Sequence, residues 1–353
     1  MRLCSLPLPT LIRPYIHHFW IFEADGGLPA TDQRLVAPNG RPKLIVTYRN
    51  GLSTHSQAGV TTTAEGRISL IGVWDRSTIL SSAEAPTVTI GVEFTPNGLC
   101  RFFGGDLARL TNRIVAADDL LGAAGARLTA RVMEAPDAAS AARQVSAFLV
   151  ERFLSCDVRQ ARVIDHAIGR FQQAGYRMDI GALADEIGCS RRTLQALFTS
   201  HVGLTPKRLQ SVLGFSRLYT VFASSGDPSL LRDEALDIYY DQPHFIRNFK
   251  AYTGHSPGRF AELMNEFGQI FYRRVTPGRG RGRNGARHQP CGQAPGSEAA
   301  ARAGDRMRQR GTRHQPSVAC FRRSGNQLGV KKGPGNSAIW LLVGGSGCYL
   351  RDP

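Results

Sequence analysis

The chain has 353 residues and a formal net charge of +16 at pH 7, which is enough length for two domains that each have their own core. Its apolar runs are far shorter than the roughly 20 residues of a membrane-spanning helix, and early prolines interrupt any signal-peptide pattern. The seven cysteines are scattered singly and form no C-x-x-C pair. This favours reduced thiols in the cytoplasm over a disulfide framework or a zinc site, and we expect no membrane partner.

The positive charge is concentrated in the last part of the sequence. Residues 268–353 hold 16 Lys and Arg against 3 Asp and Glu, whereas the preceding 267 residues hold 28 against 25. The overall charge is therefore no argument for nucleic-acid binding by the rest of the chain. The same segment is rich in Gly, Arg and Pro without an apolar period, which predicts a disordered tail. Two interpretations stay open: a cationic arm that adds nonspecific DNA affinity, and the product of a shifted reading frame.

Residues 1–120 are predicted to form a β-rich sensor or interaction domain. Short β-branched runs at 43–48, 67–74 and 87–94 are bounded by turn residues, as in a small barrel or sandwich. A barrel mouth beside a DNA-binding block is a natural site for a small-molecule effector. Aromatic side chains in a β-domain more often belong to the core, but four are candidates for the lining of such a site: Trp20, Phe22, Tyr48 and Trp74.

Residues 121–155 are predicted to form a helical appendage. Pro136-Asp137 divides this alanine-rich segment into two helices, and Asp137 is expected to cap the second. Val145, Phe148 and Leu149 recur every three to four residues on one side of that helix. Such an appendage packs on the β-domain or forms the face of a homodimer, and the sequence does not choose between the two.

Residues 156–267 are predicted to be helical. A first helix, capped by Asp157, ends near Gly175. The segment 206–224 carries large apolar side chains on one face and is expected to be a buried helix that Gly226-Asp227-Pro228 ends.

A helix-turn-helix pattern lies between these two helices. A short helix over 180–187 precedes Gly188, which can adopt a positive φ, and Ser190, which can cap a helix over 191–200. Arg can donate two hydrogen bonds to guanine and Gln can pair with adenine, so the exposed face of this second helix suits DNA recognition. The alternative interpretation is that this face is only solvated surface, because any amphipathic helix has a polar face. The polar residues concerned are Arg191, Arg192, Gln195 and Thr199.

The pattern recurs at an offset of 51 residues. The repeated positions, each with its counterpart, are Leu194 and Phe245, Phe198 and Phe249, Gly203 and Gly254, Pro206 and Pro257, and Arg208 and Arg259. Two helical modules at a fixed offset predict a protein that binds DNA at two places.

These residues resemble a known family. Leu183-Ala184, Gly188-Cys189-Ser190-Arg191-Arg192 and Thr205-Pro206 resemble the first helix-turn-helix of AraC/XylS-type transcription regulators. The string from Tyr240 to Phe260 resembles the second-copy signature of the same family. The N-terminal region, with Gly91-Val92-Glu93-Phe94, is similar to an uncharacterised β-rich domain found on some members.

The resemblance implies a transcription regulator without enzymatic activity or cofactor, whose two recognition helices enter adjacent major-groove segments of double-stranded DNA about 34 Å apart. Base contacts of the family fall on both copies, and Ala196 offers at most an apolar contact with a thymine methyl. The candidate DNA-binding residues are Arg191, Arg192, Gln195, Ala196, Thr199, Gln242, Pro243, His244, Arg247 and Lys250.

The second copy departs from the family pattern. The family has Ala-Leu-x-x-Gly-Tyr before the second signature, whereas the segment from Ala235 to Tyr240 lacks the Gly and is one residue shorter. Ile238 is β-branched and would resist a positive φ. We therefore expect copy two to be strained, shifted in register or nonfunctional, and copy one to dominate DNA binding. A partly decayed regulator with a frameshifted C-terminus stays an open alternative.

An enzyme is the main alternative class, namely a DNA-repair methyltransferase fused to the same type of DNA-binding block. That activity needs a reactive cysteine in a Pro-Cys-His-like setting, which neither Cys4 nor Cys100 has. His17-His18 is not expected to bind a metal, because adjacent residues of a strand point to opposite faces. No catalytic or metal-binding residue is assigned.

The predicted fold class is α+β and multidomain: a β-rich barrel or sandwich with a helical appendage, then an all-α double helix-turn-helix, then a disordered tail. The expected boundaries are 1–120, 121–155, 156–267 and 268–353. Residues 1–155 are nearly balanced in charge, and we expect them to form a separate module that does not touch DNA.

Overall fold

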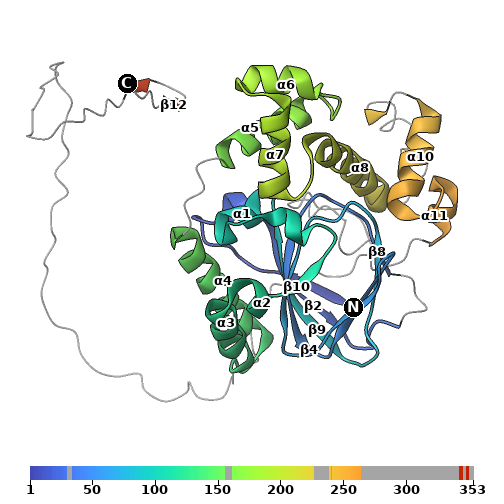
Figure 1. Ribbon diagram of the computed structural model, residues 1–353. Coiled ribbons are helices and arrows are strands. Elements are labelled where there is room, and N and C mark those ends of the chain that lie inside the picture. The colour runs from blue at the N-terminus through green and yellow to red at the C-terminus, as the bar shows by residue number, and fades with distance from the viewer. Residues whose placement is uncertain are drawn as a thin grey trace, which may run out of the picture. The chain divides into compact units, whose positions relative to one another are not determined.

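The computed structural model describes seven stretches of the chain (Figure 1): 1–29, 34–155, 161–225, 238–239, 241–263, 342–344 and 347–349. Contacts divide the chain into two units, Met1–Ala294 and Pro295–Pro353. In the second unit, β11 (Leu342–Gly344) pairs antiparallel with β12 (Gly347–Tyr349). Apart from this hairpin, the predicted tail from residue 268 onward lies outside the described residues.

The β-rich region contains two antiparallel sheets. A six-stranded sheet has the order β1-β2-β9-β4-β7-β10, and a four-stranded sheet has the order β3-β8-β5-β6. The three β-branched runs of the sequence form β4, β7 and β9 of the larger sheet. The presence of a second sheet fits the predicted sandwich. The strands are β1 (Arg2–Ser5), β2 (Ile16–Ala24), β3 (Arg34–Val36), β4 (Lys43–Arg49), β5 (Leu52–Ser56), β6 (Gly59–Thr63), β7 (Ile68–Ile71), β8 (Thr78–Ser81), β9 (Thr87–Phe94) and β10 (Ile114–Ala116).

The six-stranded sheet is buried on both faces. Phe19 and Ile21 of β2 belong to a core that also contains helical residues, whereas Trp20 and Phe22 belong to a separate apolar cluster. Because successive residues of a strand point to opposite faces, one face packs on helices and the other faces the space between the sheets. A strand buried on both faces has a continuous apolar run, as β2 shows.

The helical appendage packs on the first of these faces (Figure 1). Asp137 accepts a hydrogen bond from the Ser140 backbone N–H at 2.6 Å, which confirms the predicted cap. Val145, Phe148 and Leu149 are buried in the same core as the sheet residues, so the structure places this apolar side against the β-domain. The appendage consists of α3 (Ala123–Met133) and α4 (Ala138–Ser155). The β-rich region also contains the short helices η1 (Arg13–Tyr15), α1 (Gly98–Phe103), η3 (Leu107–Leu110) and α2 (Ala117–Leu121).

The remaining described helices form a block around α8. Phe215 of α8 lies 5.7 Å from Phe249 and 4.7 Å from Tyr252 of α10, between ring centroids, and α7 packs on the same core. The predicted buried helix that bridges the two copies is therefore confirmed, while its predicted stop at 226–228 and the Asp157 cap lie outside the described residues. The helices are α5 (Ala161–Gln173), α6 (Ile180–Ile187), α7 (Arg191–Val202), α8 (Pro206–Ser225), α10 (Gln242–Thr253) and α11 (Pro257–Leu263).

The helical block and the β-rich region are packed together. Ala37 and Val73 of the β-rich region belong to the core of the helical block, and a Cβ on Gly40 would lie 2.9 Å from Leu213 of α8. Residues 1–155 are thus in close contact with the helical block, and the expectation that they form a separate module that does not touch DNA stays a prediction. None of the described helices is long and apolar enough to cross a membrane.

Candidate nucleic-acid interface and the adjoining cavity

Three local features fix the ends of the helices in the first helix-turn-helix. Asp179 caps α6 by accepting from the Ala182 N–H at 2.8 Å. Gly188 ends α6 with φ +76°, a left-handed conformation that glycine adopts at little cost. Ser190 Oγ accepts from the Thr193 N–H at 3.0 Å and caps α7. The predicted glycine turn and serine cap are confirmed.

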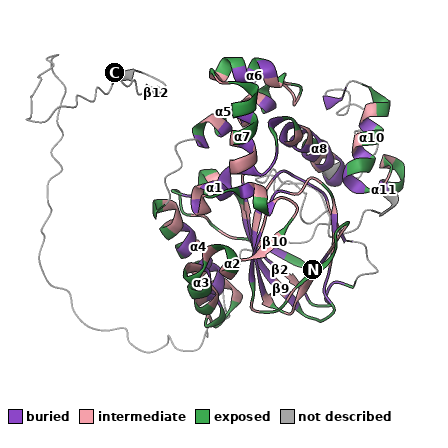
Figure 2. Ribbon diagram, in the orientation of Figure 1, coloured by how far each residue is buried: buried purple, intermediate pink, exposed green. Residues whose placement is uncertain are grey.

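The face of α7 that the sequence assigned to DNA is open to solvent. Leu194 and Phe198 are fully buried, whereas Arg192, Gln195 and Ala196 are exposed. Figure 2 colours the ribbons by burial. Thr199, in the C-terminal half of α7, is half-buried. These side chains are therefore available to a ligand that approaches α7 from outside.

Arg191 is exposed but directed toward α6. A Cβ on Gly181 would meet the Arg191 guanidinium at 1.8 Å, and Arg191 Nη2 lies 3.8 Å from Asp179 Oδ2. Both partners of this pair are more than two-thirds exposed, so it contributes little stability.

The second recognition helix, α10, has the same local construction. Asp241 caps it by accepting from the His244 N–H at 2.6 Å, and Gly254 ends it with φ +80°. Phe245 and Phe249 are buried. The exposed residues on its outer side are Gln242, Pro243, Ile246, Arg247 and Lys250.

His244 differs from its neighbours on α10, because it is half-buried and its ring lies 5.3 Å from the Tyr239 ring, edge to face. It therefore packs within the protein rather than on the exposed face.

Ile238 does not adopt the positive φ that its β-branched side chain was expected to resist. Ile238 is helical and buried, and the described non-glycine residues with positive φ are Asn50, Asn112 and Tyr176. Tyr239 is also buried, 5.6 Å from the Phe245 ring. Apart from residues 238 and 239, the first helix of copy two lies outside the described residues. In the described residues, α7 and α10 are both capped at the start and both carry exposed polar side chains.

A cavity of about 970 Å³ lies between the two sheets and is also bordered by α5 and α8. Trp20 and Phe22 line its apolar part and Trp74 also borders it, as the sequence suggested. Tyr48 does not border it: its hydroxyl donates to the Ala135 carbonyl at 2.9 Å, and its ring packs on the helix-covered core. Strand alternation explains this, because Tyr48 projects from the face of β4 opposite the cavity.

The polar part of the cavity is organised around Glu93. Its carboxylate accepts from Asn39 Nδ2 at 2.7 Å and lies 3.3 Å from Lys43 Nζ and 3.5 Å from Arg41 Nη1. Burial by itself would raise the pKa of the Glu93 carboxyl, but Lys43, Arg41, His17 and the Asn39 hydrogen bond together lower that pKa to about 2. Glu93 is therefore ionised at neutral pH and fixes both cations in place.

Both His17 and His18 border the cavity, contrary to the alternation expected of adjacent strand residues. The pairing of β2 with β9 shifts register between Ile16 and His18, and this bulge turns both rings to one side. Burial and the nearby Arg41 lower the pKa of His17 to about 4, so its ring is neutral at pH 7. Among the described residues, no group of three or more His, Cys, Asp or Glu could hold a metal ion.

The cysteines of the described residues offer no reactive setting. Cys100 is buried, and its thiol hydrogen-bonds to the Asn97 carbonyl at 3.1 Å and to Asn97 Oδ1 at 3.0 Å. Cys4 and Cys189 are half-buried. None of these three cysteines stands in the Pro-Cys-His-like setting that the methyltransferase alternative needs.

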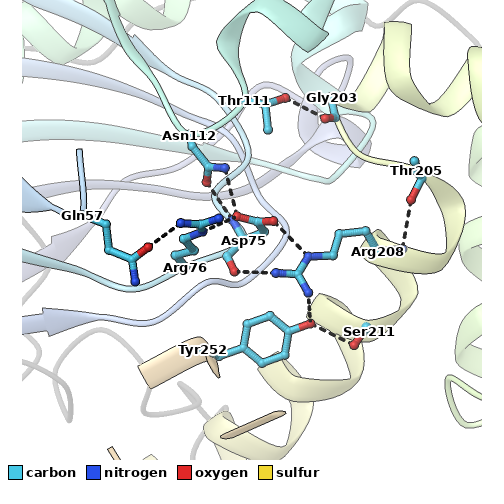
Figure 3. A network of polar contacts seen from close by, with 10 residues as sticks. All are labelled: Gln57, Asp75, Arg76, Thr111, Asn112, Gly203, Thr205, Arg208, Ser211 and Tyr252. Carbon is cyan, nitrogen blue, oxygen red and sulfur yellow. Dashed lines mark hydrogen bonds and ion pairs between the residues drawn. The ribbon is translucent and has the colours of Figure 1, made fainter. Parts of the chain in front are cut away.

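Sequence reasoning missed a polar contact between Asp75 and Arg208 (Figure 3). Arg208 Nε donates to Asp75 Oδ2 at 2.9 Å, and Arg208 Nη2 donates to the Asp75 carbonyl at 3.2 Å. The only sequence signal was that Arg208 is a repeated position whose counterpart is Arg259. Nothing local indicated that the first-copy arginine faces the β-rich region.

Comparison with known proteins agrees with the helix-turn-helix geometry. Residues 183–262 match a helix-turn-helix domain family, and residues 6–116 match a domain of unknown function, DUF6597. No curated protein sequence matches the chain significantly. The helix-turn-helix match agrees with the resemblance to AraC-type regulators that the sequence shows. The chain therefore contains a helix-turn-helix domain at 183–262 and an N-terminal domain of unknown function at 6–116.

Solved structures give weaker likenesses. Unsaturated fatty acid bound wild-type ToxT from Vibrio cholerae strain SCE256 is 12% identical, with 75% of this chain and 98% of that chain covered and a TM-score of 0.40. Another structure of ToxT from Vibrio cholerae is 10% identical, with 69% and 97% covered and a TM-score of 0.40. The AraC-like transcriptional activator CuxR is 14% identical, with 70% and 78% covered and a TM-score of 0.22.

Proposed function

We propose that this regulator reads two adjacent major-groove segments of one DNA duplex, one with α7 and one with α10. The observation that supports the proposal is the equivalence of the two helices: each is capped at its start, ends at a left-handed glycine, and packs its apolar side on α8. Because α8 connects α7 and α10, the arrangement favours insertion of both helices into the major groove at the same time. The protein would act in the cytoplasm, as the scattered cysteines predict.

Exposure and chemistry suggest separate roles for the candidate residues. Arg192 and Gln195 of α7 are suited to guanine and adenine edges, and Ala196 to a thymine methyl. Gln242 and Arg247 of α10 are suited to the same edges in the second segment. The residues proposed for backbone contacts or for shaping the interface are Arg191, Thr199, Pro243, His244 and Lys250, of which Arg191 and His244 are partly engaged within the protein.

Selection of preferred sites from random duplexes with the full chain, followed by retardation titrations, tests this proposal. We expect Arg192→Ala and Arg247→Ala each to weaken binding to the selected site by about 1–3 kcal/mol. Arg127→Ala is a matched control, because it removes the same charge from an exposed position on α3. Equal weakening by the control would show that only overall charge matters.

We further propose that the cavity binds a small-molecule effector with an apolar body and an anionic group. Among the described residues that border it, Arg41, Lys43, Arg76 and Arg217 are basic and Glu93 is acidic, while the inner part is apolar. Arg41 and Arg217 both border the cavity, as does Tyr176, whose pKa is raised by burial. Arginine binds carboxylates with paired hydrogen bonds.

Thermal melting of the full chain with decanoate and with methyl decanoate tests the effector chemistry. A ligand that binds only the folded state raises the melting temperature, and we expect decanoate to do so more than its uncharged ester. Arg217→Gln should reduce the difference between the two, whereas Arg127→Gln should not. Stabilisation by the ester alone would overturn the anionic assignment.

A further inference from the structure

Residues 74–78, which follow β7 and end at the first residue of β8, border the cavity with alternate side chains. Trp74, Arg76 and Thr78 line it, while Asp75 and Ser77 contact the helical block on the other side. Five consecutive residues therefore touch both the proposed effector site and the DNA-binding region.

Asp75 and Ser77 are hydrogen-bonded to two different helices, α8 and α10. Asp75 accepts two hydrogen bonds from Arg208. Arg208 lies in the first turn of α8, which follows α7 after a short turn. The Ser77 N–H donates to the carbonyl of Tyr252, near the C-terminal end of α10, at 3.0 Å. Arg208 also joins the two attachments, because its Nη1 donates to the Tyr252 hydroxyl at 3.4 Å (Figure 3).

The segment is itself fixed by a neighbouring loop. Asn112 Nδ2 donates to Asp75 Oδ1 at 2.9 Å, and Asn112 Oδ1 accepts from the Asp75 N–H at 3.0 Å. The preceding residue, Thr111, donates to the carbonyl of Gly203, which ends α7, at 2.6 Å. The ends of both recognition helices are thus attached to one small area of the β-rich region (Figure 3).

We propose that residues 74–78 transmit changes between the cavity and the two recognition helices, with Asp75 and Ser77 as positioning residues for DNA binding. This inference rests on the proposed function of α7 and α10. A displacement of the backbone at Trp74 or Arg76 moves the neighbouring peptide groups of Asp75 and Ser77, since the residues are consecutive. Such a coupling is reciprocal, so DNA bound at the helices must change the surroundings of Trp74.

Reciprocity allows a test that needs no effector. The chain has three tryptophans, and Trp20→Phe with Trp340→Phe leaves Trp74 as the only one. We expect the emission of Trp74 in this full-length variant to change when the selected duplex is added, with the same midpoint as the retardation titration. Adding Asp75→Asn should reduce the amplitude by more than half, and adding Arg127→Gln should leave it unchanged.

The outcomes separate this inference from the proposed function. Absence of retardation would overturn DNA binding itself. Retardation without any change in Trp74 emission would leave DNA binding intact and overturn the coupling. If Asp75→Asn does not fold, Arg208→Gln removes the same contact from the opposite side, and an undiminished emission change in either variant would also contradict the inference.

Discussion

Arg208 and Asp75 join the start of α8 to the β-rich region, with 2.9 Å between Nε and Oδ2. The Arg208 guanidinium also lies 5.1 Å from the centre of the Tyr252 ring. One side chain thus connects three parts of the fold: α8, the 74–78 segment and the end of α10. Its repeat counterpart, Arg259, is exposed in α11.

This asymmetry predicts different costs for the two arginines. Arg208→Ala should lower the free energy of unfolding by about 1–2 kcal/mol, since it removes charge-assisted hydrogen bonds from a half-exposed position. Arg259→Ala should have a smaller effect. Urea denaturation measures both, and a double-mutant cycle with Asp75→Ala should show non-additivity. Additive effects of Arg208→Ala and Asp75→Ala would contradict the contact.

The helix-ending glycines provide a second matched pair. Gly203 and Gly254 both have positive φ, +91° and +80°, but a Cβ on Gly254 would meet nothing within 4 Å, whereas one on Gly203 would lie 2.6 Å from Thr111 Oγ1. Gly254→Ala should therefore cost about 1 kcal/mol from backbone conformation alone. Gly203→Ala should cost about 1–2 kcal/mol more because of the added clash. Equal melting temperatures would show that the β-rich region does not press on the end of α7.

Glu93 gives the protein a defined acid sensitivity. Its pKa falls from an ordinary 4.5 to about 2 in the folded state, so the unfolded chain binds this proton more readily. The stabilisation is therefore complete above pH 4.5 and is lost as the pH falls toward 2. Glu93→Gln should lower the free energy of unfolding by about 2–4 kcal/mol at pH 7, because it leaves two cations without their partner.

Urea denaturation at pH 7 and at pH 3 measures this effect. The difference between the wild-type protein and Glu93→Gln should be smaller at pH 3. The exposed Glu84→Gln serves as a control, with little effect at either pH. A difference that grows on acidification would contradict the sign of the pKa shift.

Local patterns in the sequence predicted those features that local chemistry determines. The Asp137 and Ser190 caps, the Gly188 turn and the buried side of α8 all follow from residue type and spacing within one or two turns of helix. The same reasoning located β4, β7 and β9. For the site, helical periodicity identified the exposed face of α7, whereas the candidate residues of α10 came from the family resemblance.

The features that were missed depend on contacts between distant segments. The bulge that turns His17 and His18 to one side arises from pairing with β9, and the side of Tyr48 depends on which face of β4 the helices cover. The partner of Arg208 lies 133 residues away in the sequence. Ile238 was misjudged because a family pattern was taken to require a positive φ at a position that is helical here.

The most direct test of two-segment reading is hydroxyl-radical footprinting of the full chain on its selected duplex. We expect two protected patches on one face of the DNA, about 34 Å apart along the helix axis. Arg192→Ala should weaken protection of one patch and Arg247→Ala that of the other. A single protected patch, or loss of both patches together in each variant, would contradict the proposal that α7 and α10 read separate segments.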